Sequence, residues 1–185
     1  MPKVIIRRGV FETNSSSTHS YAIIGSGQME DPSKITPSSF EYYSEESWSG
    51  YYSHYIDKAI FFIQSMAFSS VDDYEEVFDQ KQLLSIGEIY EKLKEDPHYI
   101  LLKEVIYEYC GENFEFKSHY DNLTELIDVE QFRDYWLYDN ILTGNSEALP
   151  TRLTFRNIPD IEKFKEDLTD FIFNRKYVIY LTYDG

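Results

Sequence analysis

The chain has 185 residues, and its 33 acidic residues against 17 basic ones give a formal net charge of −16. Hydrophobic residues make up 42% and aromatic residues 17% of the chain, so the composition excludes global disorder and predicts a single domain, residues 1–185. A field of this sign repels nucleic acid and attracts basic proteins, which argues against sequence-independent binding of DNA or RNA.

The cysteine content and the apolar runs indicate the compartment. A single cysteine, Cys110, permits no internal disulfide and favours the cytoplasm. The N-terminal stretch MPKVIIRRGVF lacks the apolar core of a signal peptide. The longest apolar run, AIFFI at 59–63, is far shorter than the ~20 residues of a membrane span. We therefore expect a cytoplasmic protein that does not enter a membrane.

Residues 1–24 are predicted to form a strand, a loop and a strand. The segments 3–11 and 20–24 are rich in β-branched and apolar residues, and TNSSSTH at 13–19 connects them. Gly, Pro, Ser and Asp recur after the second strand, so residues 25–50 are expected to be irregular.

The middle of the chain, residues 51–142, is predicted to be helical and carries most of the acidic residues. Apolar residues at spacings of three and four predict four helices, at 51–68, 81–95, 99–109 and 129–142. Gly111 is placed to end the third of these helices. The alternation in FEFK predicts a short strand at 114–117.

The last segment, residues 151–185, is predicted to be strand, helix and strand. TRLTFRNI at 151–158 alternates polar and apolar residues, Pro159 and Asp160 begin a helix, and KYVIYLTY at 176–183 is typical of a strand. These elements predict an α+β fold class. The expected domain has a mostly antiparallel sheet that combines the N- and C-terminal strands, and a helical acidic middle.

The first candidate site is ETNSSSTHS, Glu12 to Ser20. Asn, Ser and Thr can satisfy their own backbone in Asx- and ST-type turns, so one interpretation is a purely structural connection. The other is a cluster of hydroxyls, an amide and an imidazole around a small polar or anionic ligand, with arginines supplying positive charge. The candidate ligand-binding residues are Arg7, Arg8, Glu12, Asn14, Ser15, Ser16, Ser17, Thr18 and His19.

More positive charge would reach this loop if the terminal strands pair beside it. The basic residues that would then approach are Arg152, Arg156, Arg175 and Lys176. The competing interpretation is that these cations pair with the many carboxylates of the protein instead.

RRGVFETNSSSTHS, Arg7 to Ser20, resembles the opening of a group of small, uncharacterised phage and prophage proteins. The shared signature is GVFETNSSSTHS, Gly9 to Ser20. The segment FIFNRKYVIY at 171–180 is similar to the Phe-Asn-then-strand ending of that group, with Arg175 where a proline is expected. The resemblance implies a phage or prophage origin and a signature role for Glu12 and Asn14 to His19. It implies no activity.

Catalysis at the same stretch is the weaker interpretation. Ser15 to Ser17, His19 and Glu12 are the residue types of a nucleophile, a base and an orienting carboxylate, but neighbours in a short loop rarely adopt triad geometry. Gly25-Ser26-Gly27 lacks the third glycine of a dinucleotide-binding motif. The i, i+4 spacing of a helical metal site is absent from the remaining histidines, His54, His98 and His119. We therefore favour binding over enzymatic activity and expect no cofactor and no metal.

The second candidate site is the acidic, aromatic surface of the middle region. Runs such as VDDYEEVFD at 71–79 are common on solvated helix faces, which is one interpretation. The other is a decoy, in which spaced carboxylates imitate nucleic-acid phosphates and occupy a basic groove of another protein. This face is placed near 41–46, 72–79 and 88–96. Its candidate partner-binding residues are Glu45, Glu46, Asp72, Asp73, Glu75, Glu76 and Asp79.

The sequence thus predicts a phage or prophage accessory protein that docks an acidic face on a basic host protein, such as one that binds nucleic acid. The alternative is a protein that binds a small ligand, a nucleotide or phosphate, or an enzyme, centred on Glu12 to His19. Direct contact with nucleic acid or membrane is not expected in either case.

Overall fold

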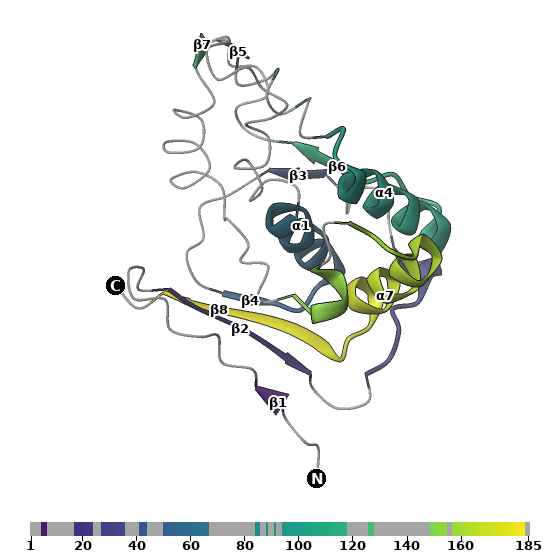
Figure 1. The fold of residues 1–185 in the computed structure, drawn as a ribbon. Coiled ribbons are helices and arrows are strands. Elements are labelled where there is room, and N and C mark those ends of the chain that lie inside the picture. The colour runs from purple at the N-terminus through teal and green to yellow at the C-terminus, as the bar shows by residue number, and fades with distance from the viewer. Residues whose placement is uncertain are drawn as a thin grey trace.

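A computed structural model describes residues 5–6, 17–23, 27–35, 41–43, 50–66, 84–85, 88, 91, 94–117, 126–127, 149–154 and 157–183. The α-helices of this part lie on one side of a four-stranded sheet (Figure 1). They are α1 (Tyr55–Met66), α4 (Pro97–Cys110) and α7 (Ile161–Phe173), and two short 3-10 helices are η1 (Pro32–Lys34) and η6 (Thr151–Leu153). The strands are β1 (Ile5–Ile6), β2 (Ser17–Ile23), β3 (Glu41–Tyr43), β4 (Gly50–Tyr52), β5 (Leu84–Ser85), β6 (Glu115–Lys117), β7 (Leu126–Ile127) and β8 (Tyr177–Tyr183).

The four-stranded sheet has the order β1-β2-β8-β4 with antiparallel neighbours. Its longest pairing joins β2 to β8 over seven residues, from Ser17 opposite Tyr183 to Ile23 opposite Tyr177. Two smaller pairs lie apart from this sheet in Figure 1, β3 parallel to β6 and β5 antiparallel to β7. The first and last parts of the chain are therefore neighbours through β2 and β8.

Helix α4 begins and ends where its sequence dictates. The Asp96 side chain accepts a hydrogen bond from the backbone N–H of His98, 2.7 Å away, and Pro97 occupies the first turn. Gly111 ends the helix with a φ of 75°, a left-handed conformation that favours glycine, and its N–H donates to the carbonyl of Tyr107. The helix predicted at 99–109 and its glycine cap are confirmed.

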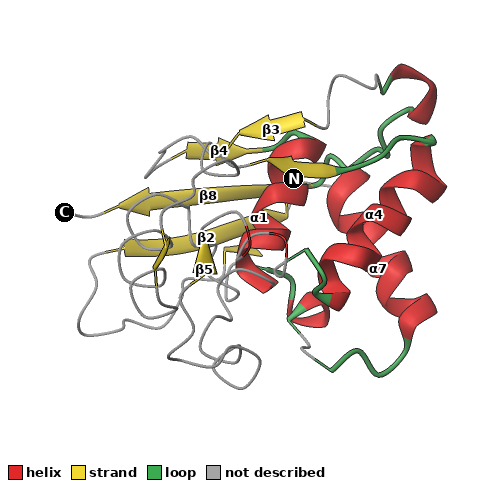
Figure 2. Ribbon diagram, turned by 90° about the horizontal axis from the view of Figure 1, so that it is seen from above, coloured by secondary structure: helices red, strands yellow, loops and turns green. Residues whose placement is uncertain are grey.

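Helix α7 is confirmed as well. Asp160 caps it by accepting a hydrogen bond from the backbone N–H of Lys163 at 3.0 Å. Its buried side chains recur at helical spacing and form one face, made of Phe164, Leu168, Phe171, Ile172 and Phe173. Viewed from above, α7 lies beside α4 (Figure 2).

The hydrophobic core lies among the three α-helices and β8. Most of its buried apolar side chains are helical, and Phe62, Leu102 and Phe171 have no exposed surface. Aromatic rings join the elements: Tyr109 of α4 stacks on Phe173 of α7 with ring centroids 4.0 Å apart. Burial of these side chains is the main source of stability in the described part of the chain.

The predicted fold class, an α+β domain of mostly antiparallel sheet, is wrong. More of the described chain is helical than extended, and the helices supply most of the core. Apart from β2 and β8, the described strands are only two or three residues long. The sequence prediction gave too much weight to short β-branched and aromatic runs, whose state is decided by packing rather than by propensity.

Several local predictions also need correction. The strand predicted at 151–158 is wrong, because Thr151–Leu153 forms the 3-10 helix η6. The helix predicted at 81–95 is wrong at its start, where Leu84–Ser85 pairs with β7 as a strand. The irregular segment predicted at 25–50 contains β3 and the start of β4, while the strand predicted at 114–117 is confirmed by β6. The helix predicted at 129–142 lies outside the described residues.

Candidate functional site

The loop predicted at 13–19 is partly strand. Ser17, Thr18 and His19 belong to β2, where they lie opposite Tyr183, Thr182 and Leu181 of β8. They were predicted as part of a connection, and this prediction is wrong for their backbone. The other candidate ligand-binding residues lie outside the described residues: Arg7, Arg8, Glu12, Asn14, Ser15 and Ser16.

The register of β2 and β8 separates the loop candidates from the C-terminal cations. Ser17 lies opposite Tyr183, whereas Arg175 and Lys176 directly precede Tyr177, which lies opposite Ile23. The partner of His19, Leu181, is six residues beyond Arg175 along the chain. The extended part of this segment, from Tyr177 to Leu181, spans about 13 Å at about 3.3 Å per residue, and Arg175 lies beyond it in the turn. The cations therefore lie near the other end of β2, away from Ser17 to His19.

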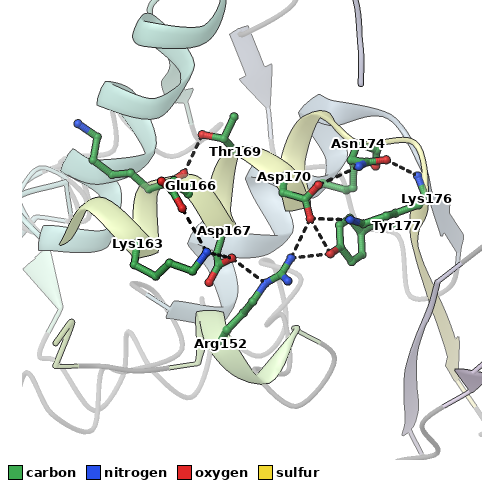
Figure 3. Close-up of polar contacts among 11 residues, drawn as sticks. Arg152, Lys163, Glu166, Asp167, Thr169, Asp170, Asn174, Lys176 and Tyr177 are labelled. Carbon is green, nitrogen blue, oxygen red and sulfur yellow. Dashed lines mark hydrogen bonds and ion pairs between the residues drawn. The ribbon is translucent and has the colours of Figure 1, made fainter. Parts of the chain in front are cut away.

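Two of the C-terminal cations, Arg152 and Lys176, instead contact Asp170 of α7 (Figure 3), whereas Arg156 lies outside the described residues. One oxygen, Asp170 Oδ2, accepts hydrogen bonds from Lys176 Nζ at 2.7 Å, Tyr177 OH at 2.8 Å and Arg152 Nη2 at 3.0 Å. The other, Oδ1, accepts from Asn174 Nδ2 at 2.8 Å. A single carboxylate thus joins η6, α7 and the start of β8.

This arrangement fixes the charge of Asp170. Partial burial alone would raise the pKa of its carboxyl, but hydrogen bonds from Lys176, Asn174 and Tyr177, together with the charge of Lys176, lower the pKa to about 2. Arg152 also lies 3.5 Å from Asp167, measured from Nε to Oδ1. Because the charges of Arg152 and Lys176 are balanced by carboxylates of the protein itself, we interpret this group as a structural clamp and not as an anion-binding site.

Asn174 forms the turn from α7 to β8. Its side-chain oxygen accepts from the backbone N–H of Lys176, and its own N–H donates to the carbonyl of Asp170. Its carbonyl accepts from Lys58 Nζ of α1, 2.9 Å away. Lys58 is only 1% exposed, and burial lowers its pKa to about 8. A buried ammonium therefore links α1 to this turn.

Residues 27–35 form a strap across the same turn. Met29 makes a β-bridge with Asn174, and the backbone N–H of Glu30 donates to the carbonyl of Phe173 at 2.7 Å. Arg175 donates two hydrogen bonds to the Glu30 carboxylate, at 2.7 and 2.8 Å, which lowers the pKa of Glu30. The strap and the turn are thus held by both backbone and side-chain contacts.

The predicted partner-binding residues lie outside the described residues: Glu45, Glu46, Asp72, Asp73, Glu75, Glu76 and Asp79. The described acidic residues inside the predicted ranges of this face are Glu41, Glu88, Glu91, Glu95 and Asp96, and further carboxylates lie on α4. In the ion pairs on and just before α4, the carboxylate side chain is more exposed than the lysine side chain. Lys165 of α7 is 14% exposed and contacts Glu104 and Glu108, which are 50% and 62% exposed. Lys94 is 22% exposed and contacts Glu91, which is 72% exposed.

In the ion pairs of the strap, the basic side chain is the more exposed partner. Arg175 is 63% exposed and covers Glu30, which is 18% exposed. Lys34 is likewise more exposed than its partner Asp31. In these ion pairs the carboxylates are therefore the more exposed partners around α4 and the less exposed partners at the strap.

Cys110 and three of the four histidines, His19, His54 and His98, lie in the described part of the chain. Groups of three or more His, Cys, Asp or Glu with ligand geometry are absent from this part of the chain. His98 is buried and bonded to Asp96 through Nδ1, and His119 lies outside the described residues. Burial raises the pKa of the Cys110 thiol, so Cys110 is not an activated nucleophile. Within the described residues, none of the helices combines the length and the apolar character needed to span a bilayer.

Sequence reasoning missed the residues that organise the turn from α7 to β8, namely Lys58, Asp170, Asn174 and Tyr177. Lys58 lies in a mostly apolar helical segment, and Asp170 follows a run of both acidic and basic residues, so neither position is distinctive in the sequence. The segment FIFNRKYVIY at 171–180 contains Asn174 and Tyr177, and its resemblance to the ending of the phage group is a sequence signal that points to this turn.

The chain was compared with known proteins in three ways. No family model, no curated protein and no solved structure matches it.

Proposed function

We propose that the protein acts by binding, and that its acidic surface docks on a basic partner protein. The observation that carries this proposal is the orientation of the ion pairs around α4. The lysine side chains lie inward and the carboxylates of Glu91, Glu104 and Glu108 lie outward, so solvent and any partner meet negative charge. A net charge of −16 extends the attraction beyond contact distance and speeds association.

The alternative, a phosphate or nucleotide site at Glu12 to His19, has less support. Arg152, Arg175 and Lys176 were the described cations expected to add positive charge to that site, beside Arg7 and Arg8 of the site itself. The three described cations contact Asp170 or Glu30, and the β2–β8 register sets Arg175 and Lys176 apart from His19. The opening signature supports an accessory protein of phage or prophage origin, so the partner in this proposal is a host protein.

Affinity capture from a bacterial lysate tests the proposal. The immobilised protein is washed at about 50 mM and about 500 mM salt, which changes screening several-fold. A triple variant with Ser15, Ser16 and His19 changed to alanine serves as the matched control. We expect both proteins to capture the same basic partner at low salt and to release it at high salt. Capture that resists salt, or that the triple variant loses, would contradict the proposal.

A further inference from the structure

The outward face of α4 carries apolar side chains among its carboxylates. Ile100 is 46% exposed and Tyr107 is 59% exposed. They are seven residues apart, so they lie on one side of the helix about 10 Å from each other along its axis. Glu104 and Glu108 lie on the same side, one turn from Ile100 and directly after Tyr107.

The opposite side of α4 packs against the hydrophobic core. Leu101, Leu102, Val105 and Ile106 are buried in the core. Glu104 and Glu108 are held by Lys165 of α7, whose side chain is itself only 14% exposed. Because this lysine is less exposed than both carboxylates, Glu104 and Glu108 are the outer partners of these ion pairs.

An exposed tyrosine and isoleucine within a charged rim have the character of an interface. Protein interfaces enrich aromatic anchors at the centre and leave charged residues at the edge. Apolar residues seven apart match the repeat of a helix laid along α4, since packed helices meet through rows of residues three, four and seven apart.

We propose that the outward face of α4, formed by Ile100, Glu104, Tyr107 and Glu108, docks an amphipathic basic helix of the partner protein. Apolar residues of that helix cover Ile100 and Tyr107, and its lysines or arginines pair with Glu104 and Glu108. The charge complementarity is the reason for this occupant, since an acidic helix or a second copy of this acidic face would be repelled. The inference rests on the proposed function and names the partner's chemistry.

A pair of synthetic peptides tests the docking face. One contains leucine and lysine with leucines at helical spacing, and the other has the same composition in a scrambled order without that spacing. Their affinities for the full-length protein are measured by fluorescence anisotropy at low salt. We expect the amphipathic peptide to bind at least about ten-fold more tightly than the scrambled peptide.

Substitutions locate the contact. Tyr107→Ser and Ile100→Ser are expected to reduce the affinity of the amphipathic peptide to that of the scrambled one. Ile161→Ser is the matched control, because Ile161 is 55% exposed but lies at the start of α7. It is expected to leave both affinities unchanged. Amide chemical-shift changes in the wild-type protein provide a second readout and are expected to concentrate at residues 100–108.

The failures of the two proposals are distinguishable. Equal binding of both peptides, shifts away from residues 100–108, or an equal effect of Ile161→Ser and Tyr107→Ser would overturn the docking face while leaving an electrostatic binding function. The absence of binding by either peptide at low salt would overturn both the docking face and the proposed function.

Discussion

The amine of Lys58 on α1 donates a hydrogen bond to the backbone carbonyl of Asn174, 2.9 Å away, at the residue where α7 turns into β8. The lysine is 1% exposed, and Glu30, Asp170 and Asp57 stabilise its charge without fully offsetting the cost of burial. The Asn174 carbonyl also accepts from the backbone N–H of Tyr177 at 3.2 Å. The turn therefore keeps one of its bonds even when the lysine is removed.

Lys58→Met is expected to remove a pH dependence of stability. The pKa of Lys58 is about 8 in the folded protein, against 10.5 for an unburied lysine. Between these two pH values the lysine is protonated in the unfolded chain and mostly deprotonated in the folded protein, so the unfolded chain binds more protons. Wild-type stability should therefore rise by up to about 3 kcal/mol between about pH 8 and about pH 10, and fall back as the pH drops through 8. Urea denaturation across this range measures the rise.

The methionine variant should show a flatter profile and equal or greater stability than the wild type at about pH 7, because it removes a buried charge. Burial also raises the pKa values of Tyr109 and Tyr177, so their opposing effect begins only above about pH 10. A variant that retains the wild-type slope would show that Lys58 is not the titrating group.

Asp170→Asn is expected to lower the free energy of unfolding by about 2 kcal/mol near pH 7. The carboxyl has a pKa of about 2 in the folded protein and an ordinary value of 3.8, and its loss leaves Arg152 and Lys176 without their shared acceptor. Since the folded pKa is lowered, this contribution is present above about pH 4 and is lost as the pH falls toward 2. Chemical denaturation at neutral and acidic pH measures both effects.

Glu166→Gln is the control for that prediction. Glu166 lies on the same helix, is 72% exposed and pairs with the exposed Lys163, so its substitution should change the free energy of unfolding by less than about 0.5 kcal/mol. Equal losses from the two substitutions would mean that the carboxylate cluster does not act as a clamp.

Gly27→Ala is expected to be more damaging than Gly111→Ala. A Cβ on Gly27 would overlap the backbone nitrogen of Lys176 and the side chain of Asn174, and backbone cannot move aside cheaply. Gly111 has open space around it and only the cost of its left-handed conformation, about 1 kcal/mol. Thermal denaturation of both variants compares them, and a smaller loss for Gly27→Ala would argue against close packing of the strap.

His19→Ala and Arg175→Ala are expected to act independently. The partner of His19, Leu181, lies about 13 Å along β8 from Tyr177, and Arg175 lies beyond Tyr177 in the turn, so a direct contact is not expected. A double-mutant cycle on stability should therefore give a coupling energy within about 0.5 kcal/mol of zero, while Glu30→Ala and Arg175→Ala should couple. Coupling between His19 and Arg175 would revive a ligand site that joins the two.

Helices α4 and α7 were predicted well because each has an end signal and a row of apolar residues at helical spacing. Asp160 and the apolar row of α7 predict where that helix begins and which face it buries, and Gly111 predicts where α4 ends. TRLTFRNI was misread because its alternation fits a strand, whereas Arg152 is held in η6 by contacts to Asp167, Asp170 and Tyr177. Such contacts depend on residues far along the chain.

The sequence also left open whether the C-terminal cations approach Ser17, Thr18 and His19. The positive charge expected near Ser17 to His19 required a particular strand register, which sequence spacing does not fix. The pairing of Ile23 with Tyr177 places Arg175 at the far end of β2. The acidic surface was predicted from composition, but only the relative exposure of Lys165, Glu104 and Glu108 reveals which sign of charge faces outward.

The salt dependence of binding to a captured basic partner tests the central claim most directly. The equilibrium constant is measured with the purified pair from about 50 mM to about 500 mM salt. The account predicts a fall in affinity of at least about ten-fold, with a smaller slope for a Glu104→Gln, Glu108→Gln variant. An affinity that is independent of salt would contradict the claim that the acidic surface of this protein is what its partner recognises.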